Sequence, residues 1–478
     1  MKNIVLVYGL FGLVGNACFP RGGAVLRPET LTTDLKRYLD TSVNVAGLSD
    51  YHFGVQGLVK QPFVTTELFD IATGLALTPD GRIILAGYAG DAIANEWKLA
   101  LVRYLPSGVL DSGFGTEGIV VHQFSNLLYD QINAVALQSD GLLLVGGETR
   151  VGVGQYEFLL ARYLDTGALD TNYGVHGLVN QPFMGTGSYD EIKAVAVTRL
   201  HTAMVTGYSK DAGGQKLVVA SYTSQGIAGE AFGGAGKVLQ PFLGDQHNDT
   251  GTAIVIAADG SVIVSGICAD EGKEKIKCVL LKYDATGSLI RSFGRNGILL
   301  QPFIGTENHD EIICLALQHN GAILAGGFTS DAGGRKALLI RYTSEGILDQ
   351  TFGNGGIVIQ PFLTAFPGID VINTLVLQPD GKIVVAGSTN GGAGDKYFLA
   401  RYDVNGNLDS LFGKGGIVIS PFIGDGNGDD IQDLALAPNG SLIAAGYTLD
   451  SGGSKMFVSC ITDATNQSFF CSGGVLCG

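Results

Sequence analysis

The chain has 478 residues, 72 of them glycine, and a formal net charge of −15 at pH 7. Hydrophobic residues make up 46% and charged residues only 16%, which favours a packed globular protein over a disordered one. The negative charge argues against a nucleic-acid partner, because such partners bind basic patches. We also expect no transmembrane segment, because no stretch approaches ~18 uninterrupted apolar residues.

Residues 1–17 are typical of a secretory signal peptide. Lys2 precedes a short apolar run, and small residues stand at Gly15 and Ala17, the two positions that a signal peptidase reads. The alternative is a buried first strand. Cleavage after Ala17 would leave Cys18 first, but Gly15 stands where a lipobox prefers Leu, so lipidation of Cys18 stays open. The sequence therefore predicts a secreted or cell-surface protein.

Export would permit disulfide bonds. Cys268 and Cys278 flank a hairpin turn, and Cys471 and Cys477 lie close together in the tail, so both pairs are candidate disulfides. Cys314 falls on an apolar strand and is expected to be a core thiol. No cysteine has zinc-site spacing, so no structural metal of that kind is expected.

An aromatic residue followed by glycine recurs about every 60 residues. It stands at Phe53, Phe114, Tyr173, Phe232, Phe293, Phe352 and Phe412. Each copy holds four strand-like runs separated by glycine-rich turns, such as Asp380-Gly381, which suits a two-residue hairpin. Because a fixed period of this length with four strands is typical of a β-propeller, we predict that architecture.

An aspartate opens the first strand of every copy. These residues are Asp70, Asp130, Asp190, Asp249, Asp310, Asp370 and Asp429. The predicted fold is therefore all-β, a seven-bladed β-propeller of four-stranded antiparallel blades. Residues four and six after each aspartate are mostly small, whereas residues five and seven are Leu, Val or Ile. This alternation predicts the innermost strand, where blades crowd the axis. Asp433 breaks the pattern for no reason visible in the sequence.

The phase of the repeat suggests how the ring closes. The first repeat begins with an outer strand at residues 58–63, and the last copy ends after its third strand. An N-terminal outer strand can therefore complete the last blade and protect its edge. The rival is the tail, since residues 470–476 resemble the same strand. The predicted organisation is a signal peptide (1–17), an N-terminal segment with a partial repeat (18–50), the propeller (51–461) and a C-terminal tail with a degenerate outer strand (462–478).

The repeat closely resembles the delta-60 repeat family of bacterial β-propellers. The resemblance is carried best by Asp370, residues 378–383, Ala386-Gly387, residues 399–402, Leu408-Asp409 and Phe412-Gly413, and it covers roughly residues 50–461. It implies a propeller and an exported location, and it brings no catalytic residues. Some copies depart from the motif, because Ser221 and Lys282 replace its arginine and Cys460 replaces it in the last copy.

The seven aspartates allow two interpretations. They could form a ring of acceptors at one mouth of the axis that holds a hard cation such as Ca²⁺. Alternatively, each carboxylate accepts backbone N–H groups and positions its own strand, which we favour. The loops before these aspartates differ most between copies, so we place ligand binding on that rim. His247 and His309 lie there, and residues 424–430 have a calcium-loop composition without the closing Glu of an EF-hand. No cofactor is predicted.

Known catalytic motifs are missing, so catalysis is uncertain and less expected than binding. The first hypothesis is a non-catalytic exported scaffold that binds a protein or glycan partner through one rim. A second is a carbohydrate-active hydrolase or lyase that uses rim carboxylates. A third is a structural component of a cell-surface layer. A group of polar residues found in one blade and not in the others would favour the second hypothesis. The sequence does not determine the oligomeric state.

Overall fold

The computed structural model describes residues 47–61, 69–91, 96–127, 129–180, 189–241, 243–244, 247–269, 275–307, 309–362, 368–390, 394–420 and 423–462. All of them belong to one compact unit, Val45–Gly478. They form strands, turns and bends, and no helix among them is long and apolar enough to cross a membrane. The expected signal peptide, Cys18, Cys471, Cys477 and the degenerate tail strand lie outside the described residues.

Antiparallel pairing gathers the strands into groups of four, which we number along the chain. Group 1 contains β2 (Phe69–Leu77), β3 (Ile83–Asp91), β4 (Glu96–Tyr104) and β5 (Ile119–His122). Group 2 contains β6 (Asp130–Leu137), β7 (Leu143–Gly152), β8 (Gln155–Tyr163) and β9 (Leu178–Val179). Group 3 contains β10 (Tyr189–Val197), β11 (Ala203–Asp211), β12 (Gly214–Tyr222) and β13 (Lys237–Leu239).

The remaining groups repeat this order. Group 4 contains β14 (Asp249–Ile256), β15 (Val262–Ala269), β16 (Ile276–Tyr283) and β17 (Ile298–Leu300). Group 5 contains β18 (Asp310–Leu317), β19 (Ile323–Asp331), β20 (Gly334–Tyr342) and β21 (Ile357–Gln360). Group 6 contains β22 (Gly368–Leu377), β23 (Ile383–Asn390), β24 (Asp395–Tyr402) and β25 (Ile417–Ile419). Group 7 contains β26 (Asp429–Leu436), β27 (Leu442–Asp450), β28 (Gly453–Ile461) and β1 (Leu58–Lys60).

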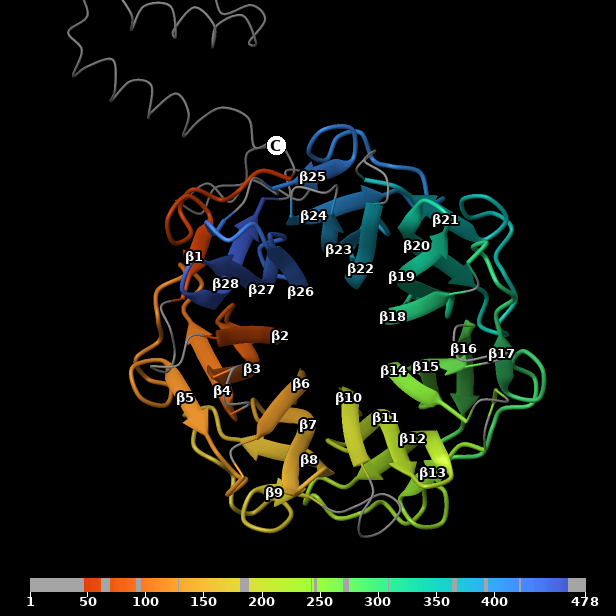
Figure 1. The fold of residues 1–478 in the computed structure, drawn as a ribbon, viewed down its shortest axis with the longest axis horizontal. Helices are drawn as coiled ribbons and strands as arrows, with labels where there is room; N and C mark the ends of the chain where they lie inside the picture. The colour runs from red at the N-terminus through yellow and green to blue at the C-terminus, as the bar shows by residue number, and fades with distance from the viewer. Residues whose placement is uncertain are drawn as a thin grey trace, which may run out of the picture. The chain divides into compact units, whose positions relative to one another are not determined.

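The first strand of each group is the innermost. In Figure 1, β2, β6, β10, β14, β18, β22 and β26 lie nearest the centre, and the later strands of each group lie farther out. These inner strands also contact one another in sequence, and β26 contacts β2. The expectation that the strand with one small face is innermost is confirmed. At Gly74, a Cβ atom would lie only 2.9 Å from Val135 Cγ1 of the next group.

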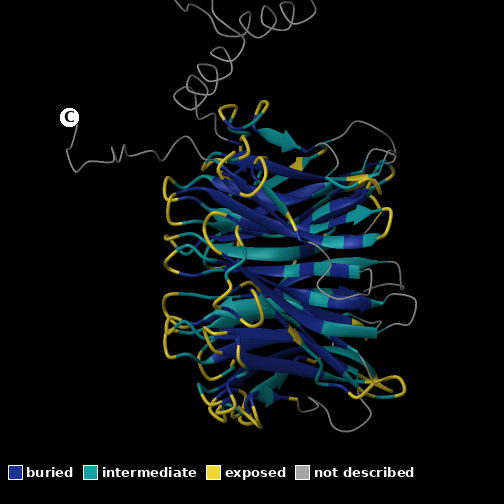
Figure 2. Cartoon of the chain, turned by 90° about the vertical axis from the view of Figure 1, so that its left-hand side faces the viewer, coloured by how far each residue is buried: buried dark blue, intermediate teal, exposed yellow. Residues whose placement is uncertain are grey.

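The hydrophobic core consists of separate clusters that lie between neighbouring groups. One hydrophobic cluster, for example, joins Ala76 and Leu99 of group 1 to Ile132, Leu143 and others of group 2. Figure 2 shows buried residues along the strands and exposed residues mainly in the loops. Polar bonds reinforce this packing, because the Tyr104 hydroxyl donates to Gln61 Oε1 at 2.7 Å and the Tyr342 hydroxyl donates to Gln301 Oε1 at 2.8 Å. Each bond joins the glutamine that follows the outer strand of one group to a tyrosine on the third strand of the next group.

The N-terminal strand β1 pairs with β28, in the register Leu58↔Ser459 to Lys60↔Phe457. A further bridge joins Ser49 to Ile461. Asp433 lies on β26 of the same group, and its contacts explain why it departs from the small-residue pattern. Its carboxylate accepts the Leu75 N–H of group 1 at 2.8 Å and the Thr374 hydroxyl of group 6 at 3.1 Å. One side chain thus connects three groups.

The predicted Cys268–Cys278 disulfide is wrong, because neither of these buried thiols forms a disulfide bond. In the register of β15 and β16, Cys268 faces Lys277 and Cys278 faces Ile267. Cross-strand partners share a face and successive residues alternate. The two thiols therefore point to opposite faces of the sheet. Burial raises the pKa of the Cys278 thiol, and it also raises the pKa of Cys314.

Candidate functional site

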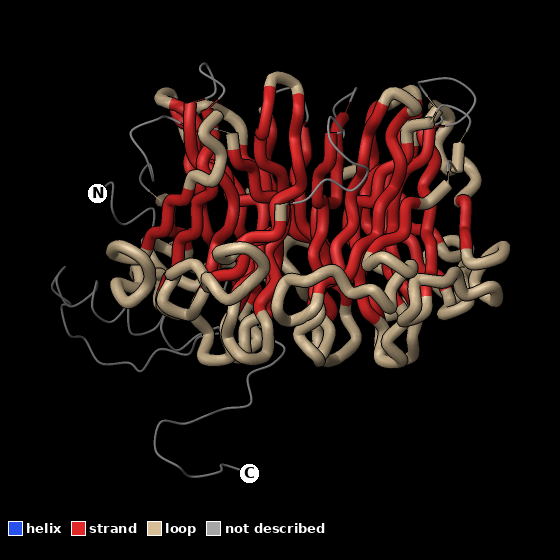
Figure 3. The backbone as a smooth tube through the Cα atoms, turned by 90° about the horizontal axis from the view of Figure 1, so that it is seen from below, coloured by secondary structure: helices blue, strands red, loops and turns tan. Residues whose placement is uncertain are grey.

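The strands run between two rims of loops (Figure 3). We call the rim at which the first strands begin the Asp rim, and the opposite rim, which holds the Asp-Gly turns, the turn rim. The seven strand-initial aspartates are all at most 2% exposed. Asp130 shows how they are used. It accepts backbone N–H groups from Phe124 and Ser125 and the Thr149 hydroxyl, which lies 2.6 Å from Oδ1.

The same arrangement recurs with local substitutions. A hydroxyl on the second strand also donates to Asp190, Asp310, Asp370 and Asp429. Preceding loops supply backbone N–H groups to Asp249, Asp310, Asp370 and Asp429. In groups 1 and 4 the hydroxyl position holds Ala89 and Cys268. These contacts fit carboxylates that position their strands better than a set that lines an open channel mouth.

Asp249 shows the effect of losing the hydroxyl. Its Oδ1 is buried and has no hydrogen-bond partner among the described residues. Burial raises the pKa of Asp249 to about 6, while the backbone N–H groups of Leu243 and Gly244 act in the opposite direction. Burial gives this direction, since it also raises the pKa of Asp130, which has a hydroxyl donor; without that donor, the effect of burial on Asp249 is less opposed.

The two rim histidines do not come together. His309 Nε2 lies 2.9 Å from Glu311 Oε1 on its own strand, and the His247 carbonyl accepts the Gln215 N–H of the neighbouring group. Within the described ranges, no group of three or more His, Cys, Asp and Glu side chains is placed to hold a metal ion. In the glycine-rich segment before β26, Asp425 accepts the Ser451 N–H and Asp429 accepts the Ile423 N–H. Both carboxylates are therefore already used by the chain.

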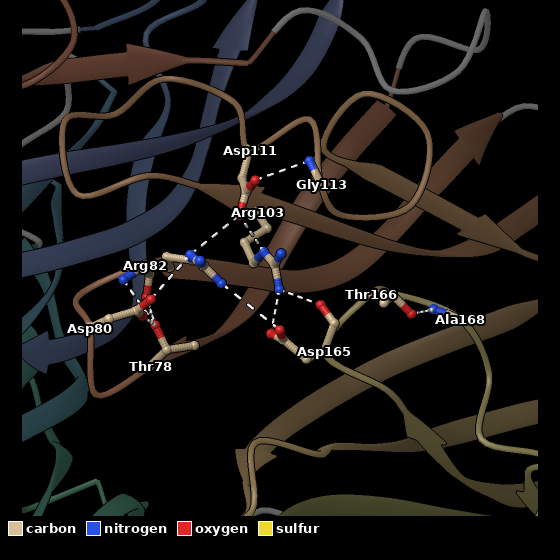
Figure 4. A network of polar contacts seen from close by, with 9 residues as sticks. All are labelled: Thr78, Asp80, Arg82, Arg103, Asp111, Gly113, Asp165, Thr166 and Ala168. Atoms are coloured by element: carbon tan, nitrogen blue, oxygen red, sulfur yellow. Dashed lines mark hydrogen bonds and ion pairs between the residues drawn. The ribbon is translucent and has the colours of Figure 1, made fainter.

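The turn rim carries a repeated ion-pair network (Figure 4). Arg103 Nε donates to Asp111 Oδ2 at 2.9 Å, and its Nη1 donates to Asp165 Oδ1 of the next group at 2.7 Å. Its guanidinium also stacks 4.6 Å from the centre of the Phe114 ring. Arg162, Arg341 and Arg401 repeat the contacts with their own aspartate and aromatic ring. The motif residues are thus structural.

A set of aromatic and polar side chains gathers on the Asp rim of groups 1–3, where the copies differ most in chemistry. We call this set the aromatic–carboxylate cluster. It contains Tyr88, Trp97, Tyr129, Asn133, Glu148, Tyr156, Tyr189, Glu191, Lys193 and Tyr208. Its rings form a row, with centroids 5.1 Å apart for Tyr129–Tyr156, 4.4 Å for Tyr156–Tyr189 and 5.8 Å for Tyr189–Tyr208.

Backbone pairing between neighbouring groups positions this row. At each junction, the third strand of one group pairs briefly in parallel with the start of the next first strand. The paired residues are Trp97 and Tyr129 at the junction of groups 1 and 2, and Tyr156 and Tyr189 at the junction of groups 2 and 3. At the other described junctions no pair is aromatic on both strands; Gln215 pairs with Asn248, for example, and Phe69 pairs with Ser454. Aromatic pairs therefore occur at two adjacent junctions among those described.

Each first strand contains a β-bulge, and the bulged residues Thr73, Asn133, Thr252 and Asn373 donate to a backbone carbonyl of the next group. The bulged residues are Thr73, Asn133, Lys193, Thr252, Ile313, Asn373 and Gln432. Asn133 Nδ2 lies 2.8 Å from both Ile192 O and Glu191 Oε1, and Lys193 Nζ lies 2.6 Å from the same Oε1. Bulges commonly redirect side chains in this way. Here they give Glu191 two donors.

Glu148 lies in a different environment from Glu191. Its side chain is 2% exposed, and its Oε2 is buried with no hydrogen-bond partner in the described part of the chain. The hydroxyls of Tyr129 and Tyr189 lie nearby. Burial, and then the charge of Glu191, raise the pKa of Glu148 to about 7. The cluster thus contains two carboxylates with unequal stabilisation of charge, a pattern often found at functional sites.

An exposed aliphatic surface adjoins the row. Val153, at the β7–β8 turn, is 91% exposed, and Val151 and Leu127 are also exposed. The Arg150 N–H donates to the Tyr129 carbonyl, which ties this hairpin to the aromatic junction. We call Leu127, Val151 and Val153 the apolar lip. It extends the cluster towards solvent.

The sequence analysis predicted binding on the rim where this cluster lies, but it named none of the cluster residues as ligand-binding. Tyr189 lies in one of the variable loops singled out there, whereas Glu148, Tyr156 and Tyr208 lie on later strands. Comparing the copies position by position would have revealed the signal. The position of Glu148 holds Tyr88, Tyr208, Ile267, Phe328, Ser388 and Tyr447 in the other groups.

Four segments match a family model described as "Domain of unknown function (DUF5122) beta-propeller": residues 78–114, 138–173, 318–352 and 378–412. The matches support a β-propeller repeat family. They coincide with the four groups in which Arg103, Arg162, Arg341 and Arg401 pair with aspartate. The other three groups have Ser221, Lys282 and Cys460 at the position of this arginine.

Solved structures similar to the propeller are distant in sequence. Sqt1 from Chaetomium thermophilum is 14% identical, with a TM-score of 0.44 over 84% of this chain and 97% of that chain. The polysaccharide lyase Uly1 is 9% identical, with a TM-score of 0.47 over 88% and 94%. A NanB sialidase variant from Streptococcus pneumoniae is 11% identical, with a TM-score of 0.40 over 89% and 73%. Sqt1 has also been solved bound to the N-terminus of the ribosomal protein L10. No curated protein shows significant similarity to the chain.

Proposed function

We propose that residues 51–461 form a seven-bladed propeller of the delta-60 repeat type, closed by its N-terminal strand. The seven groups of four strands, the pairing of β1 with β28 and the contact between β26 and β2 support this arrangement. We further propose that residues 1–17 are a signal peptide, that the protein acts outside the cytoplasm or at the cell surface, and that it works without a cofactor.

We propose that the protein is a non-catalytic scaffold that binds a protein partner on the Asp rim of groups 1–3. The observation that carries this proposal is the row of partly buried tyrosines at two adjacent junctions, continued by the apolar lip. Tyr and Trp dominate the binding energy of protein interfaces because they bury large areas while keeping a polar group. Elsewhere the rim holds few such residues among those described.

The apolar lip favours a protein over a glycan. A valine that is 91% exposed gains from burial against aliphatic or aromatic side chains, of which a glycan has none. The net charge of −15 favours a partner with basic residues and accelerates its association. A glycan remains the chief alternative, since aromatic faces and carboxylates also suit sugar rings.

The test is selection of displayed random peptides on the full chain, followed by affinity measurement on matched variants. Val153→Asp and Tyr156→Ala on the Asp rim should weaken binding at least about tenfold. Val109→Asp, an exposed position on the turn rim, is the control and should leave binding unchanged. A glycan array probed in parallel with the same proteins covers the alternative. Glycan binding that depends on Tyr156, with no peptide that depends on it, would refute the protein assignment.

The unequal carboxylates also favour a second candidate function, a carbohydrate-active hydrolase or lyase. A carboxyl group with a raised pKa beside an ionised carboxylate is the arrangement of a general acid with a base or nucleophile. Here Glu148 would act as the acid, and Glu191, held by Asn133 and Lys193, as the charged partner. Turnover of a polysaccharide that is abolished by Glu148→Gln, with folding intact, would establish this function and overturn the non-catalytic one.

A further inference from the structure

The aromatic–carboxylate cluster contains two buried carboxyl groups, and its amide and ammonium donors both contact the same one. Glu148 and Glu191 are 2% and 5% exposed. The donors Asn133 Nδ2 and Lys193 Nζ both lie on Glu191 Oε1, at 2.8 and 2.6 Å. Glu148 Oε2 has no hydrogen-bond partner among the residues described. A buried acceptor without a donor costs free energy, so a donor from outside the chain would be stabilised there.

The surroundings of Glu148 suit an organic cation better than a metal ion. Ca²⁺ takes six to eight oxygen ligands, whereas the described residues offer no group of three or more ligating side chains. The carboxylate is instead bordered by Tyr129 and Tyr189, whose rings continue into Tyr156 and Tyr208. Aromatic faces attract ammonium groups, and tyrosine hydroxyls can accept their N–H donors.

This chemistry occurs once in the described rim. The position of Glu148 on the second strand carries no other acidic residue in groups 1 and 3–7, where it holds Tyr, Ile, Phe or Ser. An acidic residue follows the strand-initial aspartate in groups 3, 5 and 7, but Glu311 pairs with His309 and Asp430 accepts Asn373 Nδ2 and Gln432 Nε2. Glu148 alone among these combines burial with an unused oxygen.

We propose that Glu148, Tyr129 and Tyr189 form a seat for the ammonium group of a lysine side chain carried by the protein partner. This inference rests on the proposed function, because the partner supplies the lysine. The ammonium group donates to Glu148 Oε2 and lies against the tyrosine rings, while the lysine stem and its neighbours pack on the row towards the apolar lip. A lysine suits the seat because its compact ammonium is carried on a flexible four-carbon stem.

The experiment titrates the full chain with Nα-acetyl-lysine N-methylamide and with its norleucine counterpart, which has the same backbone and no charge. Saturation-transfer NMR and calorimetry report binding. The lysine probe should bind at least about tenfold more tightly than the norleucine probe. Glu148→Gln should abolish that preference, and Glu311→Gln, a rim glutamate outside the seat, should keep it. Lys193→Met removes a competing cation and should strengthen lysine binding, an effect that a purely structural Glu148 would not produce.

Three outcomes would overturn the seat: equal binding of both probes, a preference that survives in Glu148→Gln, or no gain in Lys193→Met. Glucosamine binding ten times more tightly than the lysine probe, with the same dependence on Glu148, would assign the seat to an amino sugar and overturn the lysine assignment. Melting curves of each variant establish that it is folded. The proposed function is tested separately by the selected peptides. It is refuted if the Val153→Asp and Tyr156→Ala variants still bind them.

Discussion

The hydroxyl opposite each strand-initial aspartate gives a direct test of how the repeat is stabilised. Thr149 Oγ1 lies 2.6 Å from Asp130 Oδ1, whereas Cys268 stands at the same position opposite Asp249. We predict that Thr149→Val destabilises the protein and that Cys268→Thr stabilises it. Thr and Val have nearly the same shape, so the change isolates the hydroxyl.

A hydrogen bond to a charged group contributes about 1.5–3 kcal/mol to stability. Removing the Thr149 hydroxyl should cost an amount in this range, since Asp130 is fully buried. Adding one at Cys268 should gain about 1–2 kcal/mol, because the new side chain must also be held in one rotamer. Domains of 150–250 residues shift their Tm by about 2–4 °C per kcal/mol, and a unit of roughly twice that length shifts by about half as much. Thr149→Val should therefore lower the Tm by about 2–6 °C, and Cys268→Thr should raise it by about 1–4 °C.

The gain at Cys268 should depend on pH. The pKa of Asp249 is raised to about 6 in the folded protein, against about 3.9 in an unfolded chain. The folded state therefore holds this proton more tightly, and stability falls as pH rises from about 4 to about 6 and is then level. A hydroxyl that donates to the ionised form lowers the folded pKa, so its benefit appears above about pH 6 and fades below pH 4.

Calorimetric melting at pH 4 and pH 8 measures both effects, with Cys268→Val as the matched control that has the shape of threonine and no hydroxyl. The difference between Cys268→Thr and Cys268→Val should be positive at pH 8 and near zero at pH 4. An equal Tm for these two variants at pH 8 would refute the reasoning. So would a Tm for Thr149→Val equal to that of the unmodified protein.

Three further predictions concern ring closure, the rim and metal ions. Asp433→Ala leaves the Leu75 N–H and the Thr374 hydroxyl without their acceptor and should lower stability by about 2–4 kcal/mol, measured by the Tm; an unchanged Tm would mean that Asp433 does not hold the three groups together. Glu148→Gln should raise the Tm at pH 8 and remove the loss of stability that the raised pKa of Glu148 predicts between about pH 4 and pH 7; a variant with the original slope would contradict the assignment of that titration. Excess Ca²⁺ should leave the melting curve unchanged, because the strand-initial aspartates already accept N–H and O–H donors; a rise in Tm that Mg²⁺ does not reproduce would restore the ring of acceptors as a metal site.

The repeat made the architecture predictable because its constraints are local. The small residue at Gly74, the Asp-Gly turns and the alternating strands each have one physical use, and the structure places them accordingly. The phase of the repeat predicted an N-terminal outer strand, with the tail as its rival, and the structure pairs β1 with β28. These inferences required only that every copy fold in the same way.

The predicted disulfide depended on strand register, and it was wrong. Cys268 and Cys278 lie on two strands that follow one another in the chain, but facing requires that they be direct cross-strand partners, and the register pairs each with a neighbour of the other. A shift of one residue reverses the face of a side chain. Since the turn between these strands sets the register, the spacing of two cysteines could not decide the question.

The candidate site was hidden for a related reason. The bulge after the second residue past each aspartate redirects Asn133 and Lys193 towards Glu191, and a simple alternation of faces does not anticipate it. The aromatic pairs at the junctions join residues from different copies, such as Tyr156 and Tyr189. Reading each copy by itself separates residues that the fold brings together.

Differences between copies therefore have two distinct origins in this molecule. Asp433 departs from the pattern where the end of the repeat meets its beginning, and its carboxylate accepts donors from both neighbouring groups as well as the Leu434 N–H of its own strand. Glu148 departs from the pattern where no such seam exists, and one of its oxygens has no partner among the described residues. A substitution whose polar atoms are satisfied within the chain is explained by the fold. Glu148 is not explained in this way, and in our proposal the lysine of the partner supplies the donor that the chain does not.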